Sequence, residues 1–259
     1  VENIGPTDLT IREDNVAREV LRVQPATDPI QIALMVDTSQ AARDNIRDYR
    51  QAIPAFLDIV LGDNSGGQNQ VAIVGIGERP TIFADYTSDR KKLQAGIDRI
   101  FSINQAGTYL LDAIMEVGQG FQKRKTERAV MVALVTEGPE LSDRNYQLVL
   151  ERLKASHATL HILSIGSPGN FQQDRSQVVQ LGTKSTGGRL DQVLVPSGLT
   201  TRLKELANEI VGQYRVTYSH PDSLIPPEKI EVSTKKDGLT ARGIPITPPA
   251  PARPGSRDR

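Results

Sequence analysis

Ile30-Gln31-Ile32-Ala33-Leu34-Met35-Val36-Asp37 is the stretch of sequence that decides the fold. Nearly all of it is apolar, and it ends at an acidic residue. A continuous apolar run of this length is typical of a strand that is buried on both faces, as in a parallel sheet. The same texture returns at 71–76, 129–135 and 160–165, so we expect several strands of this kind.

Between these runs the apolar residues follow a helical period. The helical stripes cover residues 46–60, 93–100, 108–117, 143–155 and 199–211. Pro54 lies inside the first stripe, where a proline should kink a helix. Residues 79–87 resemble a short edge strand. Strands that alternate with helices predict a Rossmann-like, three-layer α/β sandwich around a mostly parallel sheet.

Both ends of the chain are patterned differently from its middle. Residues 9–11 and 20–23 flank the polar cluster Glu13-Asp14-Asn15, which predicts a β-hairpin. Residues 214–218 and 229–234 alternate between apolar and polar, as antiparallel strands do.

We therefore expect a small antiparallel β appendage that is built from both ends. Its shared apolar face would comprise Leu9, Ile11, Leu21, Val23, Val216, Tyr218, Ile230 and Val232. The predicted domains are an N-terminal hairpin at 1–28, the α/β domain at 29–212, C-terminal strands at 213–243, and a disordered, proline-rich tail at 244–259.

Composition excludes several classes of protein. The 259 residues include 31 basic and 31 acidic side chains, so no net charge attracts nucleic acid or an anionic membrane. There are no cysteines, which rules out thiol nucleophiles and cysteine zinc sites. No apolar run approaches the roughly 20 residues of a membrane helix, so we expect no membrane insertion.

Motifs of catalysis are also missing from the sequence. There is no phosphate-binding loop with its strand–turn–helix context and no Gly-x-Ser-x-Gly elbow. His157 and His161 are expected to share a strand face, with no carboxylate pair near them in sequence. A structural role is therefore favoured over a catalytic or metal-binding one.

Three polar segments follow the predicted strands or precede a helix. They are Asp37-Thr38-Ser39, Gly107-Thr108 and Thr136-Glu137-Gly138. In a doubly wound sheet such loops meet at the carboxyl edge, where these folds bind ligands. Hydroxyl and carboxylate oxygens in one place suit a hard cation such as Mg²⁺.

These segments, within residues 30–211, resemble the von Willebrand factor type A domain. The flanks 9–14 and 214–218 are similar to the ends of a bacterial subgroup of secreted proteins. Members of the family commonly bind a divalent cation at a metal-ion-dependent adhesion site, whose pattern is Asp-x-Ser-x-Ser, then a Thr, then an Asp.

Carried over to this chain, the resemblance implies a metal site of Asp37, Ser39, Thr108 and Glu137. Ala41 stands where the second Ser belongs, and Glu137 stands where the last Asp belongs. Mg²⁺ requires near-octahedral geometry at about 2.0–2.1 Å, so both changes should weaken binding. Two hypotheses stay open: a degenerate site kept as a structural hydrogen-bond cluster, or a site in which water replaces the lost hydroxyl and Mg²⁺ or Mn²⁺ still binds weakly.

The resemblance and the lack of catalytic motifs predict a non-catalytic, adhesion-type module that binds a protein partner through the carboxyl edge of its sheet. The alternative is a structural scaffold in a cell-envelope assembly, contacting its partners through the β appendage. The subgroup resemblance and a first residue other than Met predict a secreted, periplasmic or cell-surface location.

Overall fold

The computed structural model describes residues 4–62, 68–166, 172–220, 227 and 229–246. Among these, the central sheet has six strands in the order β6-β5-β4-β7-β8-β9. Their bounds are β4 Ile30–Val36, β5 Gln70–Gly75, β6 Thr81–Thr87, β7 Arg128–Thr136, β8 Thr159–Ile165 and β9 Leu190–Val193. All neighbours pair in parallel except β5 with β6, which pair antiparallel at one edge.

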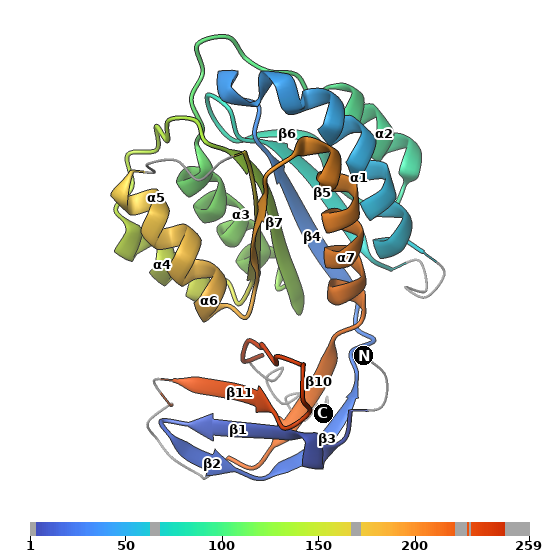
Figure 1. Cartoon of the computed structure of the whole chain (residues 1–259), viewed down its shortest axis with the longest axis vertical. Helices are drawn as coiled ribbons and strands as arrows, with labels where there is room; N and C mark the ends of the chain where they lie inside the picture. Colours follow the sequence, from blue (N-terminus) through green and yellow to red (C-terminus); the bar gives the residue numbers. More distant parts are fainter. Residues whose placement is uncertain (1–3, 63–67, 167–171, 221–226, 228, 247–259) are drawn as a thin grey trace, which may run out of the picture.

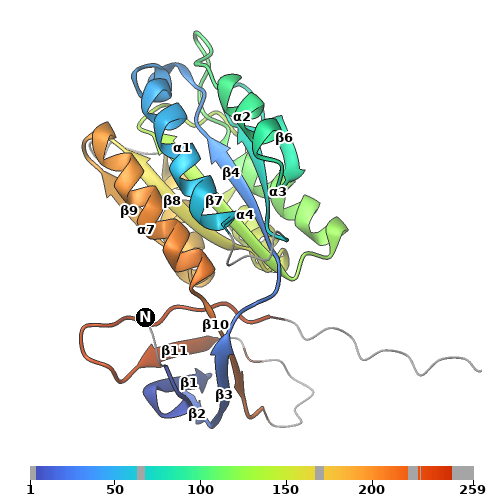
Figure 2. The ribbon, with the colours of Figure 1, turned by 90° about the vertical axis from the view of Figure 1, so that its right-hand side faces the viewer.

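Helices cover both faces of this sheet (Figure 1, Figure 2). One face carries α1 Ile46–Val60, α2 Arg90–Asp98 and α7 Leu199–Val211. The other carries α3 Leu110–Arg124, α4 Tyr146–Ala155 and a run of short helices: α5 Gln173–Gln177, η4 Val178–Gly182 and α6 Thr183–Ser185. A predicted three-layer α/β sandwich with a mostly parallel sheet is thereby confirmed. Pro54 lies within α1, which runs from Ile46 to Val60 without a break.

Alternation along β4 explains the two-sided core. Ile32 and Leu34 pack toward α1 and α7, whereas Ala33 and Met35 pack toward α3 and α4. All of β7 is buried, as expected for a strand in the middle of a covered sheet. Burial of this much apolar surface is the main term that stabilises the domain.

The β appendage lies beyond the amino ends of the central strands (Figure 1). Its strands are β1 Leu9–Glu13, β2 Val16–Arg18, β3 Val20–Pro25, β10 Tyr214–Tyr218 and β11 Ile230–Thr234. They form two antiparallel sheets, β11-β1-β2 and β10-β3. Strands from the two ends of the chain pair with each other, as predicted.

Two details of the predicted appendage are wrong. The hairpin around Asp14 joins β1 to the short strand β2, and residues 20–23 pair with β10 instead. Leu21 does not contribute to a buried apolar face, since 55% of it is exposed. The register between β3 and β10 shifts here: Thr217 pairs with Arg22 and Tyr218 with Val20, which leaves Leu21 without a partner on β10.

A buried carboxylate joins the two small sheets. Glu13 in β1 is 2% exposed and accepts hydrogen bonds from Arg18 in β2 at 2.9 Å and from the Tyr218 hydroxyl in β10 at 2.8 Å. His220 lies 2.8 Å from the same carboxylate. Burial alone would raise the pKa of Glu13, but these hydrogen bonds lower it below its usual value.

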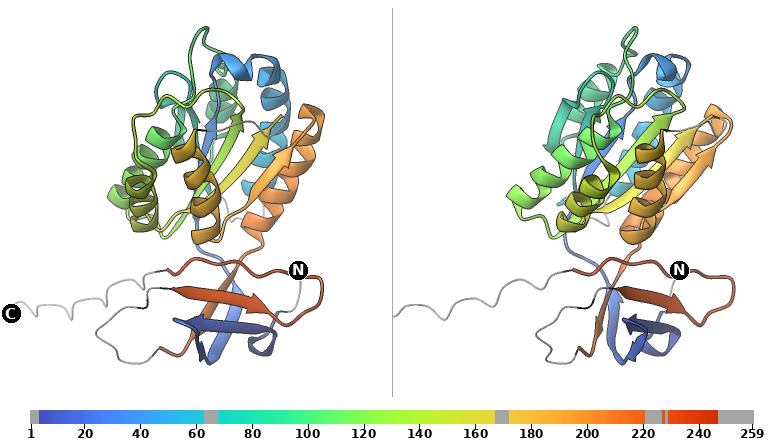
Figure 3. Two further views of the ribbon diagram at one scale, coloured as in Figure 1. Left: turned by 60° about the vertical axis from the view of Figure 1, so that its left-hand side comes forward. Right: turned by 90° about the vertical axis from the view of Figure 1, so that its left-hand side faces the viewer.

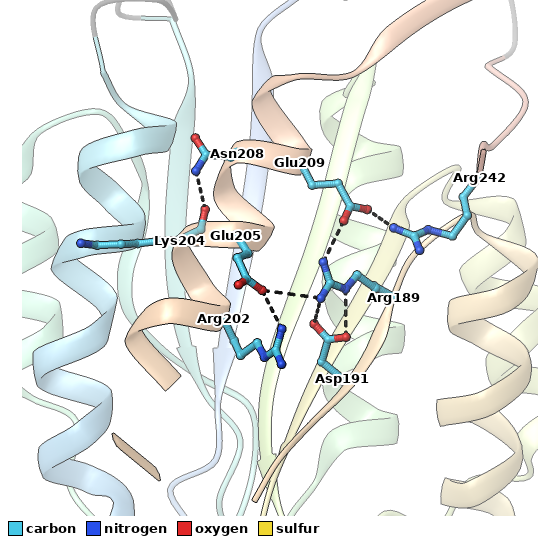
Figure 4. Close-up of polar contacts among 8 residues, drawn as sticks. All are labelled: Arg189, Asp191, Arg202, Lys204, Glu205, Asn208, Glu209 and Arg242. Carbon is cyan, nitrogen blue, oxygen red and sulfur yellow. Dashed lines mark hydrogen bonds and ion pairs between the residues drawn. The ribbon is translucent and has the colours of Figure 1, made fainter. Parts of the chain in front are cut away.

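The α/β domain is tied to the appendage at two places. Arg128, at the start of β7, donates to the carbonyls of Ala26 and Asp28 and to the side-chain oxygen of Gln213, so it binds both connecting segments. Residues 235–246 return from β11 to the α/β domain, beneath β9 and α7 (Figure 3). There Arg242 pairs with Glu209 of α7, which also binds Arg189 at 3.1 Å (Figure 4).

Most of the predicted tail, 247–259, lies outside the described residues. The division of the chain into four segments stays a prediction.

Candidate functional site at the carboxyl edge of the sheet

The predicted site residues lie at the carboxyl edge of the central sheet. This edge lies at the end of the sheet opposite the appendage (Figure 1). Asp37 directly follows β4, and Ser39 comes two residues later. Thr108 precedes α3, and Glu137 directly follows β7. Because β4 and β7 are adjacent and parallel, their ends bring Asp37 and the Thr136–Glu137 segment together.

Asp37 is the centre of a buried hydrogen-bond cluster. Its Oδ2 atom accepts from the Thr108 hydroxyl at 3.2 Å and from both the backbone N–H (3.1 Å) and the hydroxyl (2.5 Å) of Thr136. Its Oδ1 atom accepts from the backbone N–H of Ser39 at 2.9 Å. Four donors thus surround a carboxylate that is fully buried, which is how a buried charge is accommodated.

Ser39 joins this cluster through its backbone, not through its side chain. Its hydroxyl is buried and has no hydrogen-bond partner within the described parts of the chain. Gly138 packs over it: a Cβ atom on Gly138 would lie 3.4 Å from the Ser39 hydroxyl and 2.8 Å from the Cβ atom of Ala41. The loop after β7 therefore closes over the two hydroxyls of Ser39 and Thr108.

Glu137 is engaged with the neighbouring strand. Its Oε1 atom accepts a hydrogen bond from the Ser164 hydroxyl, near the end of β8, at 3.0 Å. Its Cγ atom lies 3.8 Å from where a Cβ atom on Gly166 would be. The carboxylate is thereby held at the β7–β8 side of the edge.

Two charged residues of this edge were not predicted as part of it. Arg175 in α5 is fully buried and donates to the carbonyls of Thr136 at 2.6 Å and Gly138 at 2.9 Å. Glu140 is 3% exposed and accepts from the backbone N–H groups of Leu110 and Ser142, each at 3.2 Å. Burial raises the pKa of Glu140 despite these bonds.

Electrostatics connect Arg175 to the acidic residues of the site. Burial lowers the pKa of its guanidinium, and the nearby charges of Glu140, Asp37 and Glu137 oppose that effect. Arg175 does not stand out in the sequence, because it lies in a short polar helix that has no apolar periodicity. Glu140 does not stand out either. Thr136 belongs to a segment that was predicted at this edge, but its two hydrogen bonds to Asp37 were not predicted.

These residues fit a divalent cation poorly. Within the described ranges, no group of three or more His, Cys, Asp or Glu side chains could hold a metal ion. Mg²⁺ usually keeps several water ligands, yet the hydroxyl of Ser39 has no contact with solvent. Asp37 is already surrounded by donors, Ala41 offers no oxygen, and Glu137 binds Ser164. The hydroxyl of Ser39 alone among these groups resembles a metal ligand, because it is buried and has no hydrogen-bond partner among the described residues.

Four exposed apolar side chains lie in loops at this edge of the sheet. Phe101 is 58% exposed, in the loop whose Ile103 N–H donates to the carbonyl of Thr38. Leu194 and Val195 follow β9 and are 66% and 62% exposed. Leu141 is exposed beside Thr108, whose carbonyl accepts from the Leu141 N–H. The carboxyl edge thus combines a buried polar cluster with an apolar rim, which comprises Phe101, Leu141, Leu194 and Val195.

The histidines do not form a site at this edge. His161 lies near the start of β8, is 1% exposed, and burial lowers its pKa to about 4. His157 lies in the turn before β8 with φ of 53°, so the predicted shared strand face is wrong. The residue in the turn has a left-handed backbone and does not belong to the pleated strand.

Comparison with known proteins gives a family match for part of the chain. The profile of the family described as von Willebrand factor type A domain matches residues 32–139. No match was found among curated proteins.

The chain is similar in structure to the VWA domain of SpRpn10, with 15% identity and a TM-score of 0.54 over 70% of this chain and 95% of that one. It is also similar to proximal thread matrix protein 1 from the mussel byssus with a zinc-occupied MIDAS motif (16% identity, TM-score 0.59, 76% of this chain and 49% of that one). A third similar structure is the pilus adhesin SpaC from Lactobacillus rhamnosus GG, with 13% identity and a TM-score of 0.55 over 79% of this chain and 34% of that one. The matched region spans half or less of the last two proteins.

Proposed function

We propose that the chain carries a von Willebrand factor type A domain, whose family profile matches residues 32–139, and that it is a non-catalytic, adhesion-type module that binds a protein partner through the carboxyl edge of its sheet. Domains of this family commonly mediate interactions between proteins. The observation that carries the proposal is the apolar rim at that edge, formed by Phe101, Leu141, Leu194 and Val195. Several exposed apolar residues in the loops at one edge of a sheet favour a protein-binding surface.

The buried cluster beneath the rim supports a binding role over catalysis. Asp37 accepts hydrogen bonds on both oxygens, so it is not free to act as a base or a nucleophile. In this proposal the cluster fixes the loops that carry the rim, since Thr38, Thr108 and Thr136 are all bound at the strand ends. Divalent cation is bound weakly or not at all.

We also propose a location outside the cytoplasm: secreted, periplasmic or on the cell surface. The similarity to a bacterial pilus adhesin favours this location. None of the helices in the described part of the chain is long and apolar enough to cross a membrane.

The alternative proposal is a scaffold in a cell-envelope assembly that binds through the β appendage. Val16 in β2 and Leu21 in β3 favour it, because they are 54% and 55% exposed on that appendage. Rim and appendage lie at opposite ends of the molecule (Figure 1), so substitutions in one leave the other intact.

The two proposals can be separated with matched double variants. A partner is first isolated on the immobilised chain from envelope extract of the producing cells, and its affinity for each purified variant is then measured. Phe101→Ser/Leu194→Ser should weaken binding at least about tenfold, or 1.4 kcal/mol, whereas Val16→Ser/Leu21→Ser should leave it unchanged. The reverse result would support the scaffold and contradict the adhesion-type module.

A further inference from the structure

We infer that the guanidinium of Arg175 takes the place of a divalent cation at the carboxyl edge, supplying the positive charge there and holding the loop after β7. It deepens the proposed function and rests on it only for one consequence: the partner is recognised without a metal ion. The charge balance of the edge can be measured on the purified chain without a partner.

The burial of Arg175 is the first observation. An arginine is almost never fully buried unless its charge is paired, and this one has no exposed surface. Its two terminal nitrogens donate to two carbonyls of one loop, those of Thr136 and Gly138. The loop is thereby held at the residue before Glu137 and at the residue after it.

The same loop carries the donors of Asp37. The carbonyl of Thr136 accepts a hydrogen bond from Arg175, and the N–H and hydroxyl of Thr136 both donate to Asp37. A continuous path of hydrogen bonds therefore runs from the guanidinium to the buried carboxylate. In a metal-ion-dependent adhesion site, a bound cation supplies the positive charge near this carboxylate. Here the charge belongs to a side chain, which cannot dissociate from the protein.

Charge balance is the second observation. Asp37 and Glu140 are buried carboxylates, and Glu137 is partly buried beside them. Each of the three interacts favourably with the Arg175 charge. Buried like charges need a compensating cation, and the guanidinium meets that need permanently.

The remaining space is the third observation. Gly138, which Arg175 holds by its carbonyl, approaches Ala41 so closely that a Cβ atom there would lie 2.8 Å from the Ala41 Cβ atom. The Ser39 hydroxyl beneath it has no contact with solvent. A metal ion with its own water ligands would have to displace this loop and would face the guanidinium charge.

The inference can be tested with Mn²⁺ alone as the probe, counting free Mn²⁺ by electron paramagnetic resonance. Ala41→Ser/Glu137→Asp restores the ligand types of the resembled site, and the triple variant adds Arg175→Met. We expect no measurable affinity in the natural chain, and at least tenfold tighter Mn²⁺ binding in the triple variant than in the double variant. Arg175→Lys in the same double-variant background keeps the charge and should bind as weakly as the double variant.

Three results would overturn the inference. They are tight binding by the natural chain that Ser39→Ala weakens, equal affinity of the double and triple variants, and binding by the Arg175→Lys variant that matches the triple variant. If circular dichroism shows that Arg175→Met does not fold, Arg175→Gln, which retains a donor for the loop carbonyls, replaces it with the same expectations. Because no partner is involved, failure of the proposed binding surface would leave these results unaffected.

Discussion

Replacing Asp37 with alanine should destabilise the domain strongly, because the carboxylate is a buried acceptor for several strand ends at once. Its removal leaves the backbone N–H groups of Ser39 and Thr136 without their acceptor. Each unsatisfied buried donor costs about 1–3 kcal/mol. The two threonine hydroxyls that also donate to it can rotate toward other acceptors, so we assign the loss to the N–H groups. The expected fall in the free energy of unfolding is about 4 kcal/mol.

Urea unfolding followed by far-ultraviolet circular dichroism measures this loss, since the chain has no tryptophan. Asp44→Ala is the matched control, because Asp44 lies nearby in η2 (Gln40–Asn45) and is exposed. It should change the free energy by no more than about 0.5 kcal/mol. A loss below about 1 kcal/mol for Asp37→Ala, or an equal loss for Asp44→Ala, would refute the reasoning that the cluster stabilises the strand ends.

Three other predictions concern the rest of the molecule. Burial lowers the pKa of His161 from 6.5 to about 4. Between these pH values the unfolded chain binds a proton on this side chain and the folded chain does not. The free energy of unfolding should therefore fall as the pH drops from 6.5 toward 4, by about 3 kcal/mol in total. His161→Leu should flatten this slope in urea titrations, and an unchanged slope between pH 6.5 and 5 would disprove the assignment. Deleting residues 1–28 removes the partners of Val216 and Val232, so amide-exchange protection at both should disappear; retained protection would show that β10 and β11 are stable alone. Truncation after Gly243 keeps the Arg242–Glu209 pair and should leave the melting temperature unchanged, whereas a fall of more than about 2–4 °C would show that residues 244–259 contribute to the fold.

The central sheet could be predicted from sequence because buried parallel strands have a simple signature. β4, β7 and β8 are continuous apolar runs, and the helices between them carry one apolar face each. Residues 173–193 were missed for the opposite reason. They form short helices and the exposed edge strand β9, whose burial depends on neighbours and not on their own periodicity.

The site was predictable in part. Its strand-end position places Asp37 beside the hydroxyl of Thr108, and the two residues lie in contact. The role of the Ser39 backbone, the Thr136 donors and above all Arg175 could not be derived from spacing. Arg175 lies far from Asp37 in sequence, and only the packing of α5 against the loop after β7 brings its charge to the edge.

The proposal that the carboxyl edge binds a protein is tested most directly by a map of photo-crosslinks. A photoreactive amino acid is placed singly at Phe101, Leu194, Val16 and Leu21, and at Gln94 of α2 as an exposed control away from the rim. Each chain is then irradiated with envelope extract, once without and once with EDTA. The account predicts one shared adduct from Phe101 and Leu194 and none from the other three positions. Adducts confined to Val16 and Leu21, or rim adducts that disappear when EDTA is added, would contradict it.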